Sequence, residues 1–103
     1  MIYEMRVYTT LPGKVPELNA LFEKEGLPVI NEYSKLVGWW STEVGPLNQV
    51  VHLWAYNDAG HREQVRAAQN KDPRLMSYRP KVLAMLVSQT NMLLTPASFS
   101  PLQ

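Results

Sequence analysis

Two short segments of the chain place ionisable and aromatic side chains at alternate positions. The two sets are Glu4, Arg6 and Tyr8 in the first segment, and His52, Trp54 and Tyr56 in the second. A period of two is typical of one face of a β-strand. If the two strands are neighbours in one sheet, both sets lie side by side on the same face. Aromatic walls with a few convergent polar groups are typical of a small-molecule site.

His52 is the best candidate for proton transfer, because histidine titrates near neutral pH and a positioned side chain can act as general acid or base. Tyr56 is the second catalytic candidate. Arg6 would stabilise developing negative charge, and Trp54 would form a wall of the site. The alternative is structural: Glu4 and Arg6 pair with each other in a polar interior or at a subunit interface, and His52 is satisfied by hydrogen bonds within its strand.

Further candidates for ligand binding lie outside these two sets. Arg62 is a candidate to bind an anionic ligand or a carboxylate on the sheet, and its alternative role is a structural salt bridge. Trp39 and Trp40 are adjacent, so in a strand they point to opposite faces; Trp40 is our candidate for the site, with core packing or a dimer contact as the alternative. More cations follow: Arg66, Lys71, Arg74, Arg79 and Lys81. They suit an anion, but a solvated helix face is their commoner explanation.

Composition excludes several classes of chemistry. The chain has no cysteine and two histidines, so disulfides and thiolate sites are excluded, and we expect no metal site and no cofactor. A single axial histidine to haem, His52, stays open as a less favoured reading. The net charge of +1 does not suggest a nucleic-acid partner. No stretch approaches the roughly 18 apolar residues of a membrane span, and the first residues do not form a signal peptide, so we expect no membrane partner and a cytoplasmic location.

The spacing of apolar residues predicts the order of elements. Strands are expected at residues 2–10, 36–44, 49–57 and 86–94, and helices at 14–35, 59–70 and from Asp72 onward. Asn57-Asp58 offers an N-cap for the helix at 59–70, and Asp72 can cap the one that follows. We expect a kink at Gly26-Leu27-Pro28 and a break at Pro80, because proline cannot donate the helical hydrogen bond. The short loop at 45–48 predicts an antiparallel hairpin.

This βαββαβ order predicts an α+β, ferredoxin-like fold with a four-stranded antiparallel sheet in a single domain of residues 1–103. Helices cover only one face of such a sheet. A bare face rich in aromatic and aliphatic residues is unfavourable in water. We therefore expect a homodimer in which two sheets pack face to face.

Several segments together resemble the NIPSNAP family. The resemblance is carried by residues 3–8, 12–14, 38–45, 50–56 and 93–96, and by Arg62, Asp72 and Pro73. It implies the dimeric α+β barrel superfamily, whose members include cofactor-free monooxygenases, polyketide cyclases, haem-degrading enzymes and binding modules. In such relatives the ligand cavity usually lies between sheet and helices. Fold alone does not choose among these functions.

Two functional hypotheses follow. In the first, the homodimer binds a small apolar or aromatic molecule in a pocket on the sheet, with cofactor-free acid–base chemistry as a possible activity. This hypothesis predicts a closed cavity of about 300 Å³ or more beside the two residue sets. In the alternative, the chain is a non-catalytic dimeric structural or partner-binding module, and the same residues pair with each other and leave no cavity.

Overall fold

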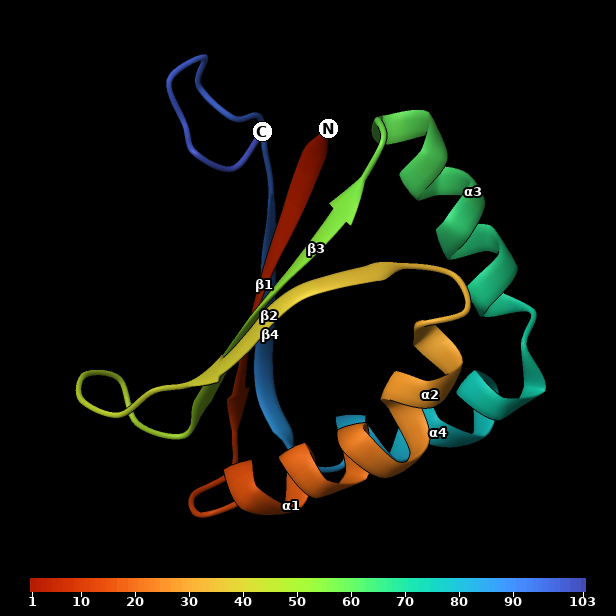
Figure 1. Cartoon of the computed structure of the whole chain (residues 1–103). Helices are drawn as coiled ribbons and strands as arrows, with labels where there is room; N and C mark the ends of the chain where they lie inside the picture. Colours follow the sequence, from red (N-terminus) through yellow and green to blue (C-terminus); the bar gives the residue numbers. More distant parts are fainter.

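Four antiparallel strands form a single sheet in the computed structural model, which describes all 103 residues, and every helix lies on one side of it (Figure 1). The elements in chain order are β1 (Ile2–Thr10), α1 (Val15–Leu21), the π-helical turn η1 (Phe22–Gly26), α2 (Leu27–Ile30), β2 (Lys35–Ser41), β3 (Gln49–Tyr56), α3 (Ala59–Asn70), α4 (Pro73–Leu83) and β4 (Leu86–Leu94). The strand order is β2-β3-β1-β4. This is the expected ferredoxin-like fold, with β1 and β3 as central neighbours.

The register of β1 and β3 determines which side chains share a face. Arg6 lies opposite His52, and Glu4 lies opposite Trp54. Directly opposed residues of an antiparallel pair project to the same side of the sheet. The two polar and aromatic sets therefore lie together, as the alternation predicted. They face the helices.

The helices differ from expectation at both prolines. The kink expected at Gly26-Leu27-Pro28 is instead a π-helical turn, in which the Leu27 amide donates to the carbonyl of Phe22 and the helical path continues through Pro28. The break expected at Pro80 is wrong, because α4 continues to Leu83. Proline removes one hydrogen bond there, to the carbonyl four residues earlier at Met76, and that residue lies on the exposed side of α4.

The N-caps of the two later helices are confirmed. Asp58 accepts a hydrogen bond from the amide of His61 at 2.7 Å, and Asp72 accepts one from the amide of Arg74 at 2.9 Å. Each carboxylate satisfies an amide that has no partner within its helix. These caps fix the points at which α3 and α4 begin, and so the approach of both helices to the sheet.

The second strand is shorter than predicted and contains an irregularity. It ends at Ser41, and its register with β3 shifts between Leu36 and Gly38. Leu36 lies opposite Trp54 and Trp39 lies opposite His52, so these residues face the helices although they are three positions apart. A bulge of one residue exchanges the faces of all residues that follow it.

The main core fills the space between the sheet and the helices. Its most deeply buried members come from α1, β3 and α4: Leu18, Val50 and Leu75. Apolar burial of this kind is the dominant stabilising term of a small domain. The core surrounds the polar set on β1 and β3, and so holds it in a fixed position.

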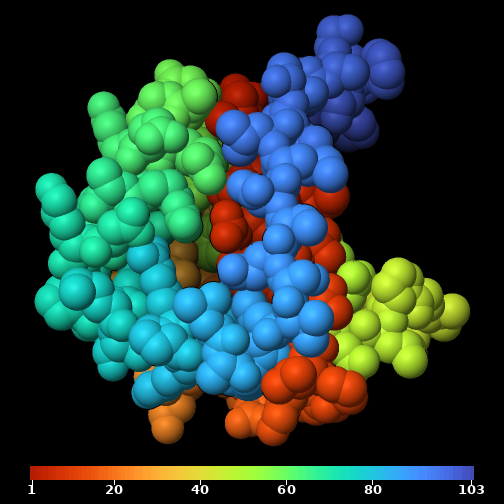
Figure 2. All heavy atoms as spheres, turned by 180° about the vertical axis from the view of Figure 1, so that it is seen from behind, coloured from red at the N-terminus to blue at the C-terminus, as the bar shows by residue number.

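The opposite face of the sheet has no helix over it. Met5 and Val7 on β1 and Leu53 on β3 project there and are only half-buried, and Trp40 is 54% exposed. Figure 2 shows the blue strand β4 at the surface beside the red β1. The sheet thus has a covered face that contains polar groups and an open face that is apolar.

Candidate functional site

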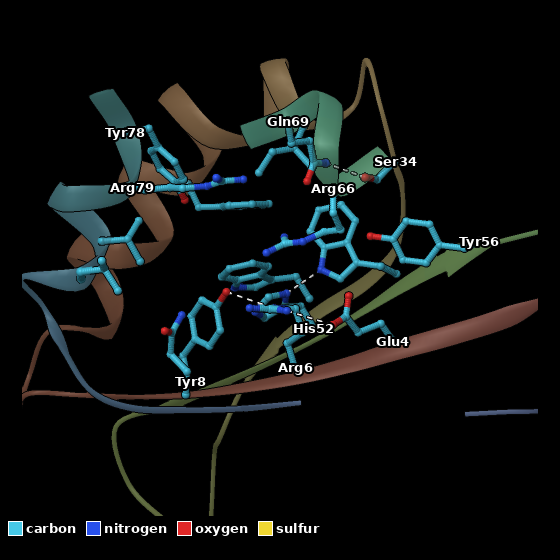
Figure 3. Close-up of a pocket in the computed structure, with 17 residues that line it drawn as sticks. Glu4, Arg6, Tyr8, Ser34, His52, Tyr56, Arg66, Gln69, Tyr78 and Arg79 are labelled. Atoms are coloured by element: carbon cyan, nitrogen blue, oxygen red, sulfur yellow. Dashed lines mark hydrogen bonds and ion pairs between the residues drawn. The ribbon is translucent and has the colours of Figure 1, made fainter. Parts of the chain in front are cut away.

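A cavity of about 240 Å³ lies between the sheet and the helices (Figure 3). Its lining is mainly aromatic, aliphatic and cationic: Glu4, Arg6, Tyr8, Phe22, Ile30, Ser34, Trp39, His52, Trp54, Tyr56, Arg66, Gln69, Tyr78, Arg79, Val82, Leu83 and Gln89. The molecule is visibly hollowed between α3 and β1 when seen from behind (Figure 2). The cavity is smaller than the roughly 300 Å³ that the binding hypothesis predicted, and it is open on one side rather than closed. It therefore suits a molecule smaller than a drug-sized ligand.

Glu4 forms the centre of a hydrogen-bonded cluster on the floor of the cavity. Its Oε2 accepts bonds from Arg6 Nη1 at 2.9 Å, Arg62 Nη2 at 2.8 Å and Asn91 Nδ2 at 2.8 Å. Its Oε1 accepts from Arg62 Nε at 3.2 Å. Burial alone would raise the pKa of Glu4, but hydrogen bonds from Arg62 and Asn91 and the charge of Arg6 lower it to about 2. Glu4 is therefore an ionised structural anchor with little capacity to take up a proton.

Arg6 connects this cluster to the aromatic side of the cavity. Its Nε donates to Tyr8 Oη at 3.1 Å, and the Tyr8 ring lies edge-on to the His52 ring with 4.6 Å between centroids. One guanidinium group thus bonds a carboxylate and a phenol oxygen at once. The proton of the Tyr8 hydroxyl remains available to another acceptor.

His52 is buried and held in one orientation. Trp54 Nε1 donates to its Nδ1 at 2.7 Å, and the Trp39 ring stacks on the imidazole with 4.3 Å between centroids. Burial, and then the charge of Arg6, lower the pKa of His52 to about 3, so it is neutral near pH 7. Because Nδ1 accepts a hydrogen bond, the proton of the neutral ring lies on Nε2. That Nε2 is buried without a hydrogen-bond partner.

This arrangement changes the chemistry available to His52. A neutral ring whose basic nitrogen is already bonded is a poor proton acceptor. Its free group is an N–H donor, which can stabilise an oxygen atom that carries negative charge. Burial similarly raises the pKa of Tyr56, so its hydroxyl stays protonated near neutral pH. Both residues that we selected for catalysis are therefore neutral donors.

The helices contribute two cations and a tyrosine to the upper side of the cavity. Arg66 from α3 and Arg79 from α4 are half-buried and reach over the cavity in Figure 3. Tyr78 on α4 is buried, and burial raises the pKa of its hydroxyl above the usual value. Beside them, Gln69 Nε2 donates to Ser34 Oγ at 2.7 Å and ties α3 to the start of β2.

The close packing of Tyr78 depends on a glycine. A Cβ at Gly26 would lie 2.6 Å from Cζ of Tyr78, which is closer than real contacts allow. Gly26 is the last residue of the π-helical turn η1. The ring of Tyr78 therefore lies between the backbone of Gly26 and the cavity.

Six of the eight residues predicted for the site line one cavity. They are Glu4, Arg6, Tyr8, His52, Trp54 and Tyr56. Arg62 is not part of the lining, but it lies behind Glu4 as its main ion-pair partner. This position agrees with the structural salt bridge that was its alternative role.

The placement of Trp40 needs correction. Trp40 lies on the open face of the sheet, opposite Val51, and Trp39 takes the place in the cavity. The physical reason is the bulge in β2. Counted in steps of two from the core residue Leu36, Trp40 would face the helices, but the extra residue transfers that position to Trp39. The open-face position agrees with the alternative of a packing or dimer contact.

Arg66 and Arg79 line the cavity although they were not predicted as site residues from the sequence. The spacing of polar residues along α3 could have indicated Arg66. Arg62, Arg66 and Gln69 follow at steps of four and three, so they share one face of α3. That face meets the sheet, where a helix normally presents apolar residues. A polar stripe toward the sheet indicates a polar space beneath the helix.

No group of three or more histidine, cysteine, aspartate or glutamate side chains is arranged to hold a metal ion. None of the helices combines the length and apolar character needed to cross a bilayer.

The fold and the cavity define a ferredoxin-like α+β domain with a polar site between sheet and helices. A family profile for NIPSNAP matches residues 3–101, and the chain belongs to the NIPSNAP family. It is 40% identical over 103 residues to human protein NipSnap homolog 3B, and 32% identical over 95 residues to a NipSnap homolog of Dictyostelium discoideum. These matches cover 99% and 92% of this chain, but 42% of each relative.

Solved structures show the same fold. An uncharacterised NIPSNAP domain protein from Burkholderia xenovorans superposes with a TM-score of 0.95 at 40% identity, covering 98% of this chain and 99% of that one. A NIPSNAP family protein of unknown function from Agrobacterium tumefaciens gives 0.96 at 36% identity, covering 100% and 94%. SnoaB, a cofactor-independent oxygenase from Streptomyces nogalater, gives 0.69 at 14% identity over 97% and 96%, which is a likeness of fold.

Proposed function

We propose that this chain binds a small molecule with an aromatic or apolar part in the cavity between sheet and helices. The observation that carries the proposal is the cavity of about 240 Å³ itself, lined by aromatic rings and by polar groups fixed in orientation. A purely structural module needs no such unfilled space. A cavity that opens to solvent and combines aromatic walls with a few fixed polar groups has the usual anatomy of a small-molecule site, so it supports a binding role.

Cofactor-free chemistry in this cavity would depend on stabilisation of negative charge. His52 offers its Nε2 proton, Tyr56 offers its hydroxyl, and Arg6 offers positive charge. Glu4 is fully bonded and does not act as the base. The geometry supports stabilisation of an enolate-like oxygen more than a histidine that abstracts protons.

The test is to close the cavity from its rim. Leu83 belongs to the lining and is 57% exposed, so Leu83→Trp adds bulk at the opening without disturbing the core. Binding of a set of single-ring aromatic fragments is measured by ligand-observed NMR. The matched control is Met76→Trp, which adds the same side chain to an exposed position of α4 outside the lining. Fragments should bind the wild type and the control but not Leu83→Trp; equal binding to all three proteins would refute the proposal.

We also propose that a second copy of the chain covers the open face. That face is apolar and continuous across β1 and β3, with Met5, Val7 and Leu53 half-buried at its centre. Exposed contiguous apolar surface is unusual for a protein that stays alone. In a homodimer with twofold symmetry, the same patch of both subunits forms the interface, and this is the commonest form of homodimer. Sedimentation equilibrium should give twice the 11.8 kDa of the chain, and a mass of 11.8 kDa at micromolar concentration would exclude the dimer. A cytoplasmic location stays a prediction.

A further inference from the structure

The charges around the cavity are not balanced. Three guanidinium groups line it, from Arg6, Arg66 and Arg79, whereas Glu4 is the one carboxylate in the lining. Glu4 already pairs with Arg6 and with Arg62 from behind the lining. No carboxylate of the chain pairs with Arg66 or Arg79. The cavity therefore contains positive charge that the protein itself does not neutralise.

Hydrogen-bond donors outnumber acceptors in the same space. The oxygens of Glu4 are occupied, the Nε2 proton of His52 has no partner, and the Tyr8 oxygen already accepts from Arg6. Burial keeps the hydroxyl of Tyr78 protonated by raising its pKa. Buried donors without partners are costly, so a molecule that fits this cavity has to supply acceptor atoms.

The two helix arginines are placed to share one anion. Arg66 follows Arg62 by one turn of α3, so both point to the sheet side, and Figure 3 shows Arg66 and Arg79 reaching over the cavity from neighbouring helices. Arg79 Nη1 donates to Asn70 Oδ1, which fixes the side chain and leaves its other nitrogens available. Burial, together with the charges of Arg66 and Arg6, lowers the pKa of Arg79, so the three cations are close enough to repel one another. An anion between them removes this repulsion.

We propose that the ligand of this cavity is an aromatic carboxylate, with its carboxylate held by Arg66 and Arg79 and its ring among the aromatic side chains of Trp39 and Trp54. The planar fork of a guanidinium group matches a carboxylate, and two such groups give charge-assisted bonds from two sides. This inference rests on the proposed small-molecule function and narrows it from any small aromatic or apolar molecule to an anion.

The experiment compares acids with their neutral amides. Benzoate and 2-naphthoate, each with its amide, are titrated into the wild-type protein at low ionic strength and followed by NMR chemical shifts. Each carboxylate should bind at least about 10-fold more tightly than its amide, because hydrogen bonds to charged groups are the stronger ones. Arg66→Gln and Arg79→Gln should each remove most of that preference while amide binding persists. Arg79→Lys should retain part of it.

Two controls are needed. One tests whether the preference for acids comes from the net charge of the protein, and the other tests whether a variant has lost its fold. Lys71→Gln removes one charge just after α3, at an exposed position outside the cavity lining, and should leave the preference unchanged. Thermal unfolding shows whether each variant is folded. Equal affinities for acids and amides in the wild type would overturn the anion inference but leave the proposed function intact. If none of the four probes binds at millimolar concentration, both the inference and the proposed function fail for this ligand class.

Discussion

The two faces of the sheet differ in which side chains need a partner. The helix side buries charged groups, and the open side leaves apolar side chains uncovered. On the helix side, Glu4 is 1% exposed and bonded to two arginines and an asparagine. On the open side, Met5, Val7 and Leu53 make no polar bonds and lack a cover within the chain. The covered face is completed by hydrogen bonds and ion pairs, whereas the open face has no partner within the chain, and we propose that a second copy covers it. Substitutions on the covered face should therefore change the free energy of unfolding, and substitutions on the open face should change self-association.

The largest effect is expected at Glu4. Glu4→Gln leaves Arg6 and Arg62 without their carboxylate, and breaking a buried ion pair costs about 3–5 kcal/mol. The free energy of unfolding from urea denaturation measures this loss. Glu63→Gln is the matched control, because Glu63 also pairs with Arg62 but is 79% exposed, so its loss should cost less than about 1 kcal/mol. Equal costs at the two positions would show that the covered face does not depend on its ion pairs.

The second effect is expected on the open face. Leu53→Asp places a charge at the centre of the proposed dimer contact, where an unpaired buried charge weakens association by about 3 kcal/mol, or roughly 100-fold. Sedimentation velocity should show monomers at concentrations where the wild type is dimeric. Leu47→Asp in the loop between β2 and β3 makes the same change at an exposed site and should leave the mass unchanged. A dimeric Leu53→Asp protein would place the interface elsewhere.

The two faces also differ in how well the sequence predicts them. The alternation in β1 and β3 predicted that Glu4 and His52 share a face, because pleating is a local property and both strands are regular. The position of Trp40 was not predictable in this way, since one extra residue in β2 exchanges the faces. Arg79 was also missed, because its position over the cavity depends on how α4 crosses the sheet, which no local pattern encodes.

A third effect concerns acid. The unfolded chain protonates histidine below about pH 6.5, whereas His52 in the folded protein stays neutral down to about pH 3. The unfolded state therefore takes up the proton first, and the stability that is complete above pH 6.5 is lost as the pH falls toward 3. The free energy of unfolding should drop by about 2 kcal/mol between pH 7 and pH 5 from this residue.

The variants separate this contribution from that of other groups. His52→Asn should flatten the pH dependence between pH 7 and pH 5, as followed by urea denaturation at each pH. His61→Asn, at the start of α3 and outside the cavity lining, is the matched substitution at the other histidine of the chain. Glu4 contributes in the same direction, but only below its unfolded pKa of 4.5, because its folded pKa is about 2. A wild-type slope in His52→Asn would assign the acid sensitivity to another group.

The smallest effect is expected at Trp54. Trp54→Phe keeps an aromatic ring but removes the donor to His52 Nδ1, a loss of about 1 kcal/mol for one hydrogen bond. Nitrogen-15 NMR of the imidazole at pH 7 should report the proton on Nε2 in the wild type and a mixture of tautomers in the variant. The same tautomer in both proteins would mean that Trp54 does not orient the ring.

Gly26 affects the shape of the cavity although it is not part of the lining. Because its backbone lies against the ring of Tyr78, any side chain at position 26 would press that ring toward the cavity. If the cavity binds a small molecule as proposed, the size that it admits would be set partly by Gly26, which lies outside the cavity lining. Selectivity between a one-ring and a two-ring compound can change through a single methyl group on the far side of a tyrosine.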